Sequence, residues 1–192
     1  MNKSSKTREI LINVARSLFA EHGVSNVTMN DIANASNKGR RTIYTYFNSK
    51  EEIYIAAIEK ELDKTIEKLK AVEAKNINPR RKLIEYIFTR LDTMKELVTR
   101  NGNLKGDFFQ DVATVEKCRK KIDIQELQII KNILKEGVEK SYFHVENVDI
   151  TAMMIHFGLR GIEIPYIKDN IREKLKNNRI NITKFLLRGL SI

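Results

Sequence analysis

The residues best suited to chemistry gather in one short stretch, Ser36 to Tyr54, which reads SNKGRRTIYTYFNSKEEIY. Two adjacent arginines stand there beside hydroxyl side chains and aromatic rings, and the stretch holds three of the chain's six tyrosines. Arginine can contact guanine through two hydrogen bonds, hydroxyls can bind phosphates, and a tyrosine ring can contact a thymine methyl. These residue types indicate a nucleic-acid contact surface; the alternative is that the rings are half-buried packing.

Two short helices and the start of a long one are expected to position this stretch. Thr28 and Asp31 have the spacing of a capping box, in which side chains satisfy backbone groups at a helix start. Ser49 and Glu52 repeat that spacing where a long helical pattern begins. A further short helix must therefore lie between them, from about residue 39 to residue 46.

That short helix should have one apolar and one polar face. Ile43 and Phe47 lie four residues apart, so both should point inward, and the arginines and hydroxyls then project outward. In the preceding turn, Asn37 tolerates left-handed backbone angles better than most residues. Two short helices around a tight turn, with arginines and hydroxyls on the second, are the arrangement that lays a helix in a DNA major groove.

The rest of the chain is helical in pattern, without strand-like alternation or repeats. A long helix is expected from about residue 49 to 75, and Pro79 suits the first turn of the next. Further helices are expected around DFFQDVATVEKC, DIQELQIIKNILKEGVEK, ITAMMIHFGLRGIEIPYI and NITKFLLRGL. The sequence predicts an all-α protein of about nine helices, with a three-helix domain over residues 1–50 and a larger helical domain over 51–192.

Charge is distributed unevenly along the chain, whose net charge is +10. Residues 1–50 hold eight Lys and Arg against three acids, residues 51–150 hold nineteen against nineteen, and residues 151–192 hold eight against three. A basic N-terminal domain suits a polyanionic partner, because neutralised phosphates release counterions. A solvated lysine-rich surface is the alternative.

Composition also narrows the class of protein. Cys118 is alone, so no intramolecular disulfide is possible and a reducing compartment fits. No apolar run is long enough for a membrane span, and the N-terminus lacks a secretory signal. We therefore expect a cytoplasmic protein without membrane contact.

The stretch and its flanks resemble the DNA-binding domain of the TetR family of bacterial repressors. That family's helix-turn-helix ends on an apolar residue, Tyr, any residue, Tyr or His, and Phe, followed by a Ser/Asn-Lys-Glu helix start. The matching residues here are Ile43, Tyr44, Thr45, Tyr46 and Phe47, then Ser49, Lys50 and Glu51, with Thr28, Ile32 and Ala33 upstream. The resemblance is close over about residues 7–60, and beyond them only the layout of helices matches.

The resemblance implies DNA contacts position by position. Base edges would be contacted by Arg40, Arg41 and Tyr44, with Thr42 assisting at the helix start. Phosphates would be contacted by Thr28, Thr45, Tyr46 and Lys50. Asn37 and Lys38 stand where the family often has Gly-Val, and the two arginines replace small residues. Those arginines favour a more G-rich or more phosphate-dependent operator than is usual in the family.

The resemblance further implies a two-fold dimer on a palindromic site, because each N-terminal domain reads one half-site. The segment ITAMMIHFGLRGIEIPYI is apolar nearly all round, which predicts burial on more than one side. A four-helix interface would use Met154, Gly158, Gly161, Ile182, Phe185, Leu186 and Leu190. A core helix in a monomer is the competing interpretation.

Family members usually carry a small-molecule pocket in the larger domain. Candidate lining residues here are Tyr86, Phe108, Phe109, His156 and Phe157, each of which could equally be core. The three histidines are scattered and Cys118 has no cysteine partner, so neither a metal site nor a cofactor is expected from residue spacing.

The function implied is that of a repressor that binds a palindromic operator as a homodimer and is released by a small-molecule effector. Alternatives of the same fold are an activator or an effector-independent regulator. A DNA-binding architectural protein without sequence preference is a more distant alternative. An enzyme is not expected, because no glycine-rich phosphate loop, nucleophile–base pair or carboxylate pair occurs in a recognisable setting.

Overall fold

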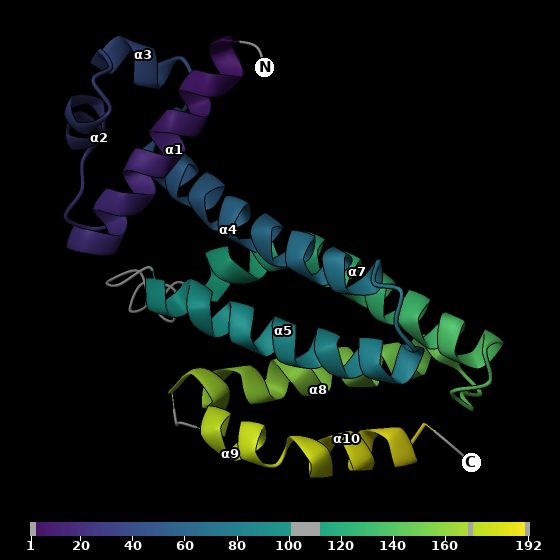
Figure 1. Ribbon diagram of the computed structural model, residues 1–192. Helices are drawn as coiled ribbons and strands as arrows, with labels where there is room; N and C mark the ends of the chain where they lie inside the picture. The colour runs from purple at the N-terminus through teal and green to yellow at the C-terminus, as the bar shows by residue number, and fades with distance from the viewer. Residues whose placement is uncertain (1–2, 101–111, 169–170, 191–192) are drawn as a thin grey trace. The chain divides into compact units, whose positions relative to one another are not determined.

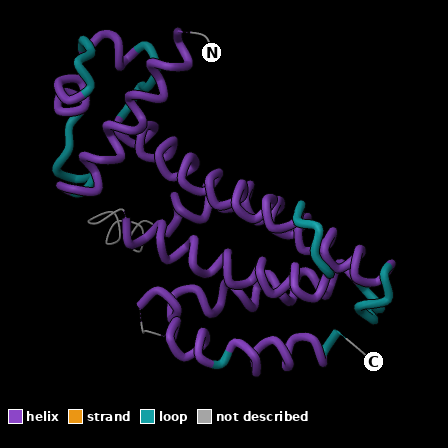
Figure 2. The backbone as a smooth tube through the Cα atoms, viewed as in Figure 1, coloured by secondary structure: helices purple, strands orange, loops and turns teal. Residues whose placement is uncertain are grey.

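The computed structural model describes residues 3–100, 112–168 and 171–190, and in these ranges it is built of helices joined by short connections (Figures 1 and 2). The helices are α1 (Lys3–His22), α2 (Met29–Ala35), α3 (Arg40–Tyr44), α4 (Lys50–Glu73), α5 (Pro79–Arg100), α7 (Val112–Glu139), α8 (Val148–Lys168), α9 (Ile171–Asn177) and α10 (Arg179–Arg188). The all-α prediction is confirmed, and the long helix expected from about residue 49 to 75 is α4.

Two helices differ from the sequence-based expectation. The segments DFFQDVATVEKC and DIQELQIIKNILKEGVEK were expected to form separate helices, but the described parts of both belong to the single helix α7. Between Cys118 and Asp123 lie Arg119, Lys120, Lys121 and Ile122, with no glycine or proline, so nothing interrupts the backbone hydrogen bonds. The short helix α9, just before α10, was not predicted.

The chain divides into two compact units. Unit 1 comprises Met1–Asp63 with Leu97–Lys120, and unit 2 comprises Lys64–Glu96 with Lys121–Ile192. Helices α4, α5 and α7 each contribute residues to both units. The helix-turn-helix belongs wholly to unit 1.

The core of unit 1 is apolar and comes from the four helices at the start of the chain. Helix α1 contributes Leu11, Ala15 and Phe19, which repeat every four residues and are all fully buried. Ile43 and Phe47 point into the same core, as their spacing predicts. Burying each such large side chain stabilises the fold by about 1.5–3 kcal/mol. Apolar packing therefore fixes the rotation of α3.

The start of α2 is set by the predicted capping box. The Thr28 hydroxyl accepts a hydrogen bond from the Asp31 backbone N–H at 3.2 Å, and the Asp31 carboxylate accepts one from the Thr28 backbone N–H at 2.8 Å. Val27 and Ile32 flank the cap and are both buried. The turn after α2 passes through Asn37, whose φ of 51° is left-handed, as the sequence suggested.

The start of α4 is capped by two neighbouring residues. The Ser49 hydroxyl accepts from the Glu52 N–H at 3.3 Å, and the Glu52 carboxylate accepts from the Asn48 N–H at 2.8 Å. In addition, Lys50 Nζ donates to the Val24 carbonyl at 2.8 Å. That last bond ties the beginning of α4 to the loop that follows α1.

Unit 2 is a helical bundle in which parts of α5 and α7 pack with α8. Its fully buried side chains include Tyr86, Ile130, Leu134 and Tyr166. Helix α9 contacts both α8 and α10, and Figure 1 shows α9 and α10 running beside α8. The His144 N–H donates to the Leu190 carbonyl at 2.7 Å, which fastens the end of α10 to the loop before α8.

We predict that Thr28→Ala lowers the free energy of unfolding by about 0.5–2 kcal/mol, because the variant loses the N-cap acceptor of α2. Hydrogen bonds from Thr28 lower the pKa of Asp31 below its ordinary value of 3.8. The contribution of Asp31 should therefore be present above about pH 4 and disappear as the pH falls through the lowered pKa. Chemical denaturation at several pH values measures both effects.

The matched control is Thr45→Ala, since the exposed Thr45 hydroxyl donates only to the Arg41 carbonyl of its own helix, at 3.1 Å. Its effect on the free energy of unfolding should stay within about 0.5 kcal/mol. Equal losses in the two variants would show that the cap has no special role.

Candidate functional site

The outer face of α3 presents the side chains that the sequence assigned to DNA. Arg40, Arg41 and Thr45 are exposed, and Tyr44 is 43% exposed. Ile43, between them, is fully buried. Because the buried residue fixes the helix rotation, two guanidiniums, a phenol and a hydroxyl face solvent together. This set, Arg40, Arg41, Tyr44 and Thr45, is the α3 face.

One pair on the α3 face is already organised. The Arg40 guanidinium carbon lies 5.8 Å from the centre of the Tyr44 ring, one helical turn away. A cation over an aromatic ring is attracted by the electrons of the ring face. Arg40 therefore has a preferred direction across Tyr44 before any partner binds.

The other predicted DNA residues lie around this face with differing freedom. The Thr28 hydroxyl donates to the Asp31 carboxylate at 2.7 Å, so it already serves the cap. Thr42 and Tyr46 are half-buried, and Tyr46 packs against the core. Lys50, also half-buried, spends one of its three N–H donors on Val24. Tyr54, the third tyrosine of the stretch, is core and meets Phe19 edge-on at 6.0 Å.

The candidate effector residues of unit 2 fall into different surroundings. Tyr86 and His156 are fully buried, and both interact with Glu126. Phe157 is 54% exposed and touches the buried pair only through an edge contact with the His156 ring at 5.2 Å. Phe108 and Phe109 lie outside the described residues. The structure thus brings two of the five candidates into one neighbourhood.

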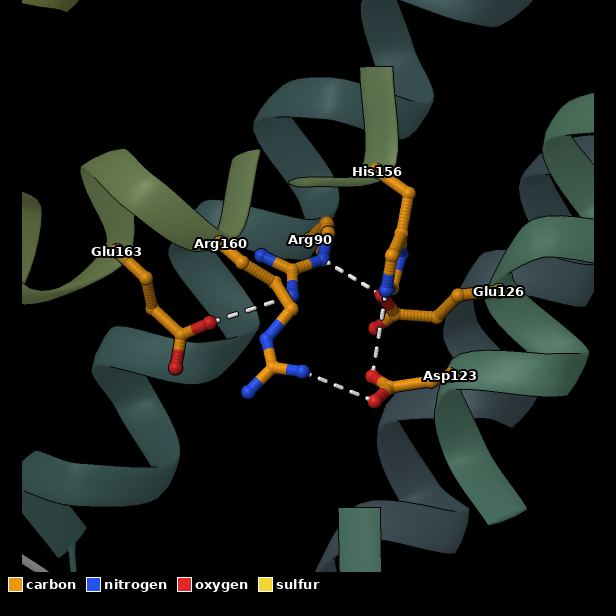
Figure 3. Close-up of polar contacts among 6 residues, drawn as sticks. All are labelled: Arg90, Asp123, Glu126, His156, Arg160 and Glu163. Atoms are coloured by element: carbon orange, nitrogen blue, oxygen red, sulfur yellow. Dashed lines mark hydrogen bonds and ion pairs between the residues drawn. The ribbon is translucent and has the colours of Figure 1, made fainter. Parts of the chain in front are cut away.

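That neighbourhood is a buried network of charges, shown in Figure 3. Arg90 of α5 donates to Glu126 of α7 at 2.8 Å and to Glu163 of α8 at 3.2 Å. Arg160 of α8 donates to Asp123 of α7 at 3.0 Å. We call the six residues drawn there, Arg90, Asp123, Glu126, His156, Arg160 and Glu163, the charge network. The charge network connects α5, α7 and α8. Its charged groups contact groups of opposite charge, as expected because an unpaired buried charge is costly.

His156 is the member of the charge network whose two ring nitrogens have no well-aligned hydrogen bond in the described structure. Its Nδ1 lies 3.2 Å from Glu126 Oε2 and its Nε2 lies 3.4 Å from Asp123 Oδ1. Neither contact has the alignment of a hydrogen bond, and both nitrogens are buried. Burial by itself disfavours the imidazolium, but the two carboxylates outweigh it and raise the pKa of His156. The environment therefore favours positive charge at this position.

Sequence reasoning missed every member of the charge network except His156, that is Arg90, Asp123, Glu126, Arg160 and Glu163. A signal was present, because His156, Arg160 and Glu163 follow each other at spacings of four and three and so share one face of α8. Asp123 and Glu126 are three residues apart and so share one face of α7. The pairing of these two faces depends on packing between distant segments, which residue spacing does not reveal.

The opposite face of α8 is apolar and exposed. Gly158 and Gly161 lie among its large side chains, and both glycines are exposed. The large side chains are 39–71% exposed, and they are Ile150, Met153, Met154, Phe157, Ile162 and Ile164. We call these eight residues the α8 outer face. Exposed apolar side chains grouped on one helix face are the kind of surface that a partner protein can cover.

The residues predicted for the dimer interface are divided by the structure. Met154, Gly158 and Gly161 lie on the α8 outer face, and Ile182 of α10 is half-buried. Leu190 is buried within its own chain. The side chains of Phe185 and Leu186 lie outside the described set. The helix that was expected to be buried on several sides thus has a charged inner face and an apolar outer one.

A groove of about 940 Å³ lies elsewhere in unit 2, lined by residues of α4, α5 and α10. Several of its charged groups are paired with each other, as in the contact of Lys75 with Glu85 at 2.6 Å and of Lys68 with Glu96 at 3.0 Å. Neither Tyr86 nor His156 lines it. Among the described helices, none combines the length and hydropathy needed to cross a membrane.

Sequence comparison matches the N-terminal segment to known regulators. Residues 11–57 match the family described as "Bacterial regulatory proteins, tetR family". Over 49 residues the chain is 49% identical to the "Probable acrEF/envCD operon repressor" of Escherichia coli strain K12. That match covers 26% of this chain and 22% of the relative, so the chain spans less than a quarter of the relative's length.

Structural comparison extends the likeness to nearly the whole chain. A transcriptional regulator from Cytophaga hutchinsonii has a TM-score of 0.75 at 25% identity, over 96% of this chain and 98% of that one. The SmeT–triclosan complex has a TM-score of 0.70 at 17% identity, over 97% of this chain and 92% of that one. With its matched helix-turn-helix and this shared fold, the chain belongs to the TetR family of bacterial regulatory proteins.

Proposed function

We propose that the protein is a transcriptional repressor that binds a palindromic DNA operator through the α3 face. The observation that carries the proposal is the pairing of a buried Ile43 with exposed Arg40, Arg41 and Tyr44 on the second helix of a helix-turn-helix. Such a helix can place arginines against guanine edges and hydroxyls against phosphates. An activator would use the same face, so the two are separated by transcription from the bound promoter.

The two arginines and Lys50 have different roles in this proposal. Arg40 and Arg41 start the recognition helix, where side chains reach base edges, and the tyrosine ring directs Arg40. Lys50 opens α4, where an ammonium that already donates to Val24 has two further N–H donors for a phosphate. Sequence discrimination should therefore depend on the arginines and general affinity on the lysine.

We predict that Arg40→Ala and Arg41→Ala each weaken operator binding by about 1–3 kcal/mol and relax the preference at particular base pairs. Lys50→Ala should weaken operator and random DNA alike and flatten the salt dependence by roughly one unit. Binding isotherms over a salt series, on operator and scrambled duplexes, measure both effects. Operator should be preferred at least about a thousandfold over random DNA, unlike the behaviour of an architectural protein.

Lys70→Ala is the matched control for these variants, because Lys70 is an exposed lysine in the last turn of the same helix α4. It should leave both duplexes bound as in the wild type. If Lys50→Ala selectively lost the operator while both arginine variants kept full discrimination, the assignment of roles would be wrong.

The proposal includes a homodimer joined through the α8 outer face. Two-fold symmetry would set one apolar face against its copy, and the exposed Gly158 and Gly161 would allow close approach of the two helices. Burying such a face removes the cost of its contact with water. Each copy would then present one α3 face to one half-site of a palindrome.

We predict that Gly161→Trp yields monomers with weakened operator binding. A Cβ at Gly161 would meet no atom within 4 Å in the described part of its own chain, so the bulk should disturb a partner rather than the fold. Ala71→Trp, at an exposed position of α4, is the control and should remain dimeric. Sedimentation and operator titration measure the outcome, and a wild type that stays monomeric at micromolar concentration with DNA would contradict the proposal.

The proposal also includes a small-molecule effector bound in unit 2 near Tyr86 and His156. Both side chains are buried, and the Tyr86 hydroxyl, whose pKa is raised by burial and then by Glu126, has no hydrogen-bond partner in the described structure. The structurally similar SmeT has been captured with triclosan, so this fold can accept a small molecule. Because α4, α5 and α7 supply residues to both units, continuous helices connect such a site to unit 1.

We predict that a ligand found by thermal-shift screening lowers operator affinity, and that operator lowers ligand affinity by the same factor. Tyr86→Phe should lower the affinity for the ligand without lowering the free energy of unfolding, because the hydroxyl that it removes has no hydrogen-bond partner in the described structure. Tyr142→Phe, at an exposed tyrosine, is the control. Calorimetry with and without operator measures the coupling, and a ligand whose affinity is the same with and without operator, or an unaffected Tyr86→Phe, would exclude this site.

A further inference from the structure

We propose that Asp123, Glu126 and His156 form a binding site for one first-row divalent transition-metal cation. One carboxylate oxygen from each acid and one imidazole nitrogen all lie within 4.8 Å of one another. Figure 3 shows the two carboxylates on α7 and the imidazole on α8 pointing toward the same place. The site would join two helices of unit 2 through one ion.

His156 has one contact whose length also suits two ligands of a single metal ion. Its two ring nitrogens face carboxylate oxygens at 3.2 and 3.4 Å, without hydrogen-bond alignment, although the side chain is fully buried. Two donors that each lie about 2.1 Å from one cation, at about 90–110° to each other, are separated by about 3.0–3.4 Å. The Asp123 Oδ1 and His156 Nε2 atoms already have that separation.

Charge provides an independent reason for a cation. The six residues of the charge network include three carboxylates and two guanidiniums, so acidic groups outnumber arginines within this set. A cation bound to one ring nitrogen of His156 would add positive charge beside Asp123 and Glu126, each of which offers a carboxylate oxygen near it.

The arginines would act as the outer layer of the site. Arg160 donates to Asp123 Oδ2, whereas His156 faces Asp123 Oδ1, so each oxygen of that carboxylate has its own role. Arg90 donates at 2.8 Å to Glu126 Oε2, the oxygen that also faces His156 Nδ1. Ligating carboxylates that are themselves hydrogen-bonded are held in orientation, as in established metal sites.

The donor set indicates the class of metal. One imidazole with two carboxylates suits Mn²⁺, Fe²⁺, Co²⁺, Ni²⁺ or Zn²⁺ better than Mg²⁺ or Ca²⁺, which prefer oxygen alone. The proposal depends neither on the operator nor on an organic effector. It can therefore fail or succeed separately from the proposed function.

The test uses the full chain, stripped with a chelator and titrated with Co²⁺ and with Zn²⁺ in the absence of DNA. Calorimetry should show one saturable site per chain, the Co²⁺ complex should absorb visible light, and the melting temperature should rise with metal concentration. Asp123→Asn and His156→Gln should each weaken binding at least about tenfold, since loss of even an outer-layer partner has that effect. Two variants are used so that a folding defect in one leaves the other informative.

Two control variants have the same chemical changes outside the site. Asp149→Asn alters an exposed carboxylate that pairs with Lys131 at 2.6 Å, and His144→Gln alters an exposed histidine. Both should bind metal as the wild type does. Equal loss in these controls, or wild-type binding that survives both site variants, would overturn the proposal.

Absence of saturable binding to the wild type would also overturn it. In that case a pH-dependent melting temperature that vanishes in His156→Gln would show that a proton on His156, not a metal, balances the network. Operator binding is measured in parallel on the stripped protein. An absence of operator binding would count against the proposed regulator and not against the metal site.

Discussion

The burial of Arg90 is the constraint on which the arrangement of unit 2 depends. A guanidinium that is only 1% exposed must be met by carboxylates, and the fold supplies Glu126 from α7 and Glu163 from α8. Holding Glu163 inward turns α8 so that His156 points inward too, since the two residues are separated by seven positions, about two helical turns. Three helices are thereby fixed in rotation as well as in position.

This inward turn of the charged face leaves the apolar face of α8 exposed. In most helices of globular proteins the apolar stripe meets the core and the charges meet water. Here the stripe of Met154, Phe157 and Ile164 faces outward while charges occupy the interior. The buried network and the exposed apolar surface are thus two consequences of one helix rotation, and the second surface is what a partner subunit would cover.

Unit 1 is held together by apolar packing and helix caps, in contrast to the buried ion pairs of unit 2. Its helix-turn-helix is positioned by apolar packing and by local caps, with Ile43 and Phe47 setting the rotation of α3 and Thr28 and Asp31 setting the start of α2. None of these interactions needs a buried ion pair. A small apolar core can therefore present Arg40 and Arg41 on a rigid surface, which is the surface that we propose contacts DNA.

The sequence by itself determined most of unit 1. Capping boxes, an Asn in a left-handed turn and four-residue apolar spacing act over a few residues, so they can be read directly, and the all-α fold follows from the same periodicity. It also indicated the family through residues that lie within one short segment. The joining of segments that carry no stop signal, as in α7, and the short helix α9 were not predicted by this local reading.

Only the tertiary structure decided which face of α8 is inside. The spacing of His156, Arg160 and Glu163 puts them on one face of that helix, but spacing alone does not show whether this face is buried or solvated. The decision depends on Arg90 and Glu126, which lie on other helices and 30 or more residues away from His156 along the chain. Pair interactions between buried charges depend on distance in space, and sequence spacing reports that distance only within one helix.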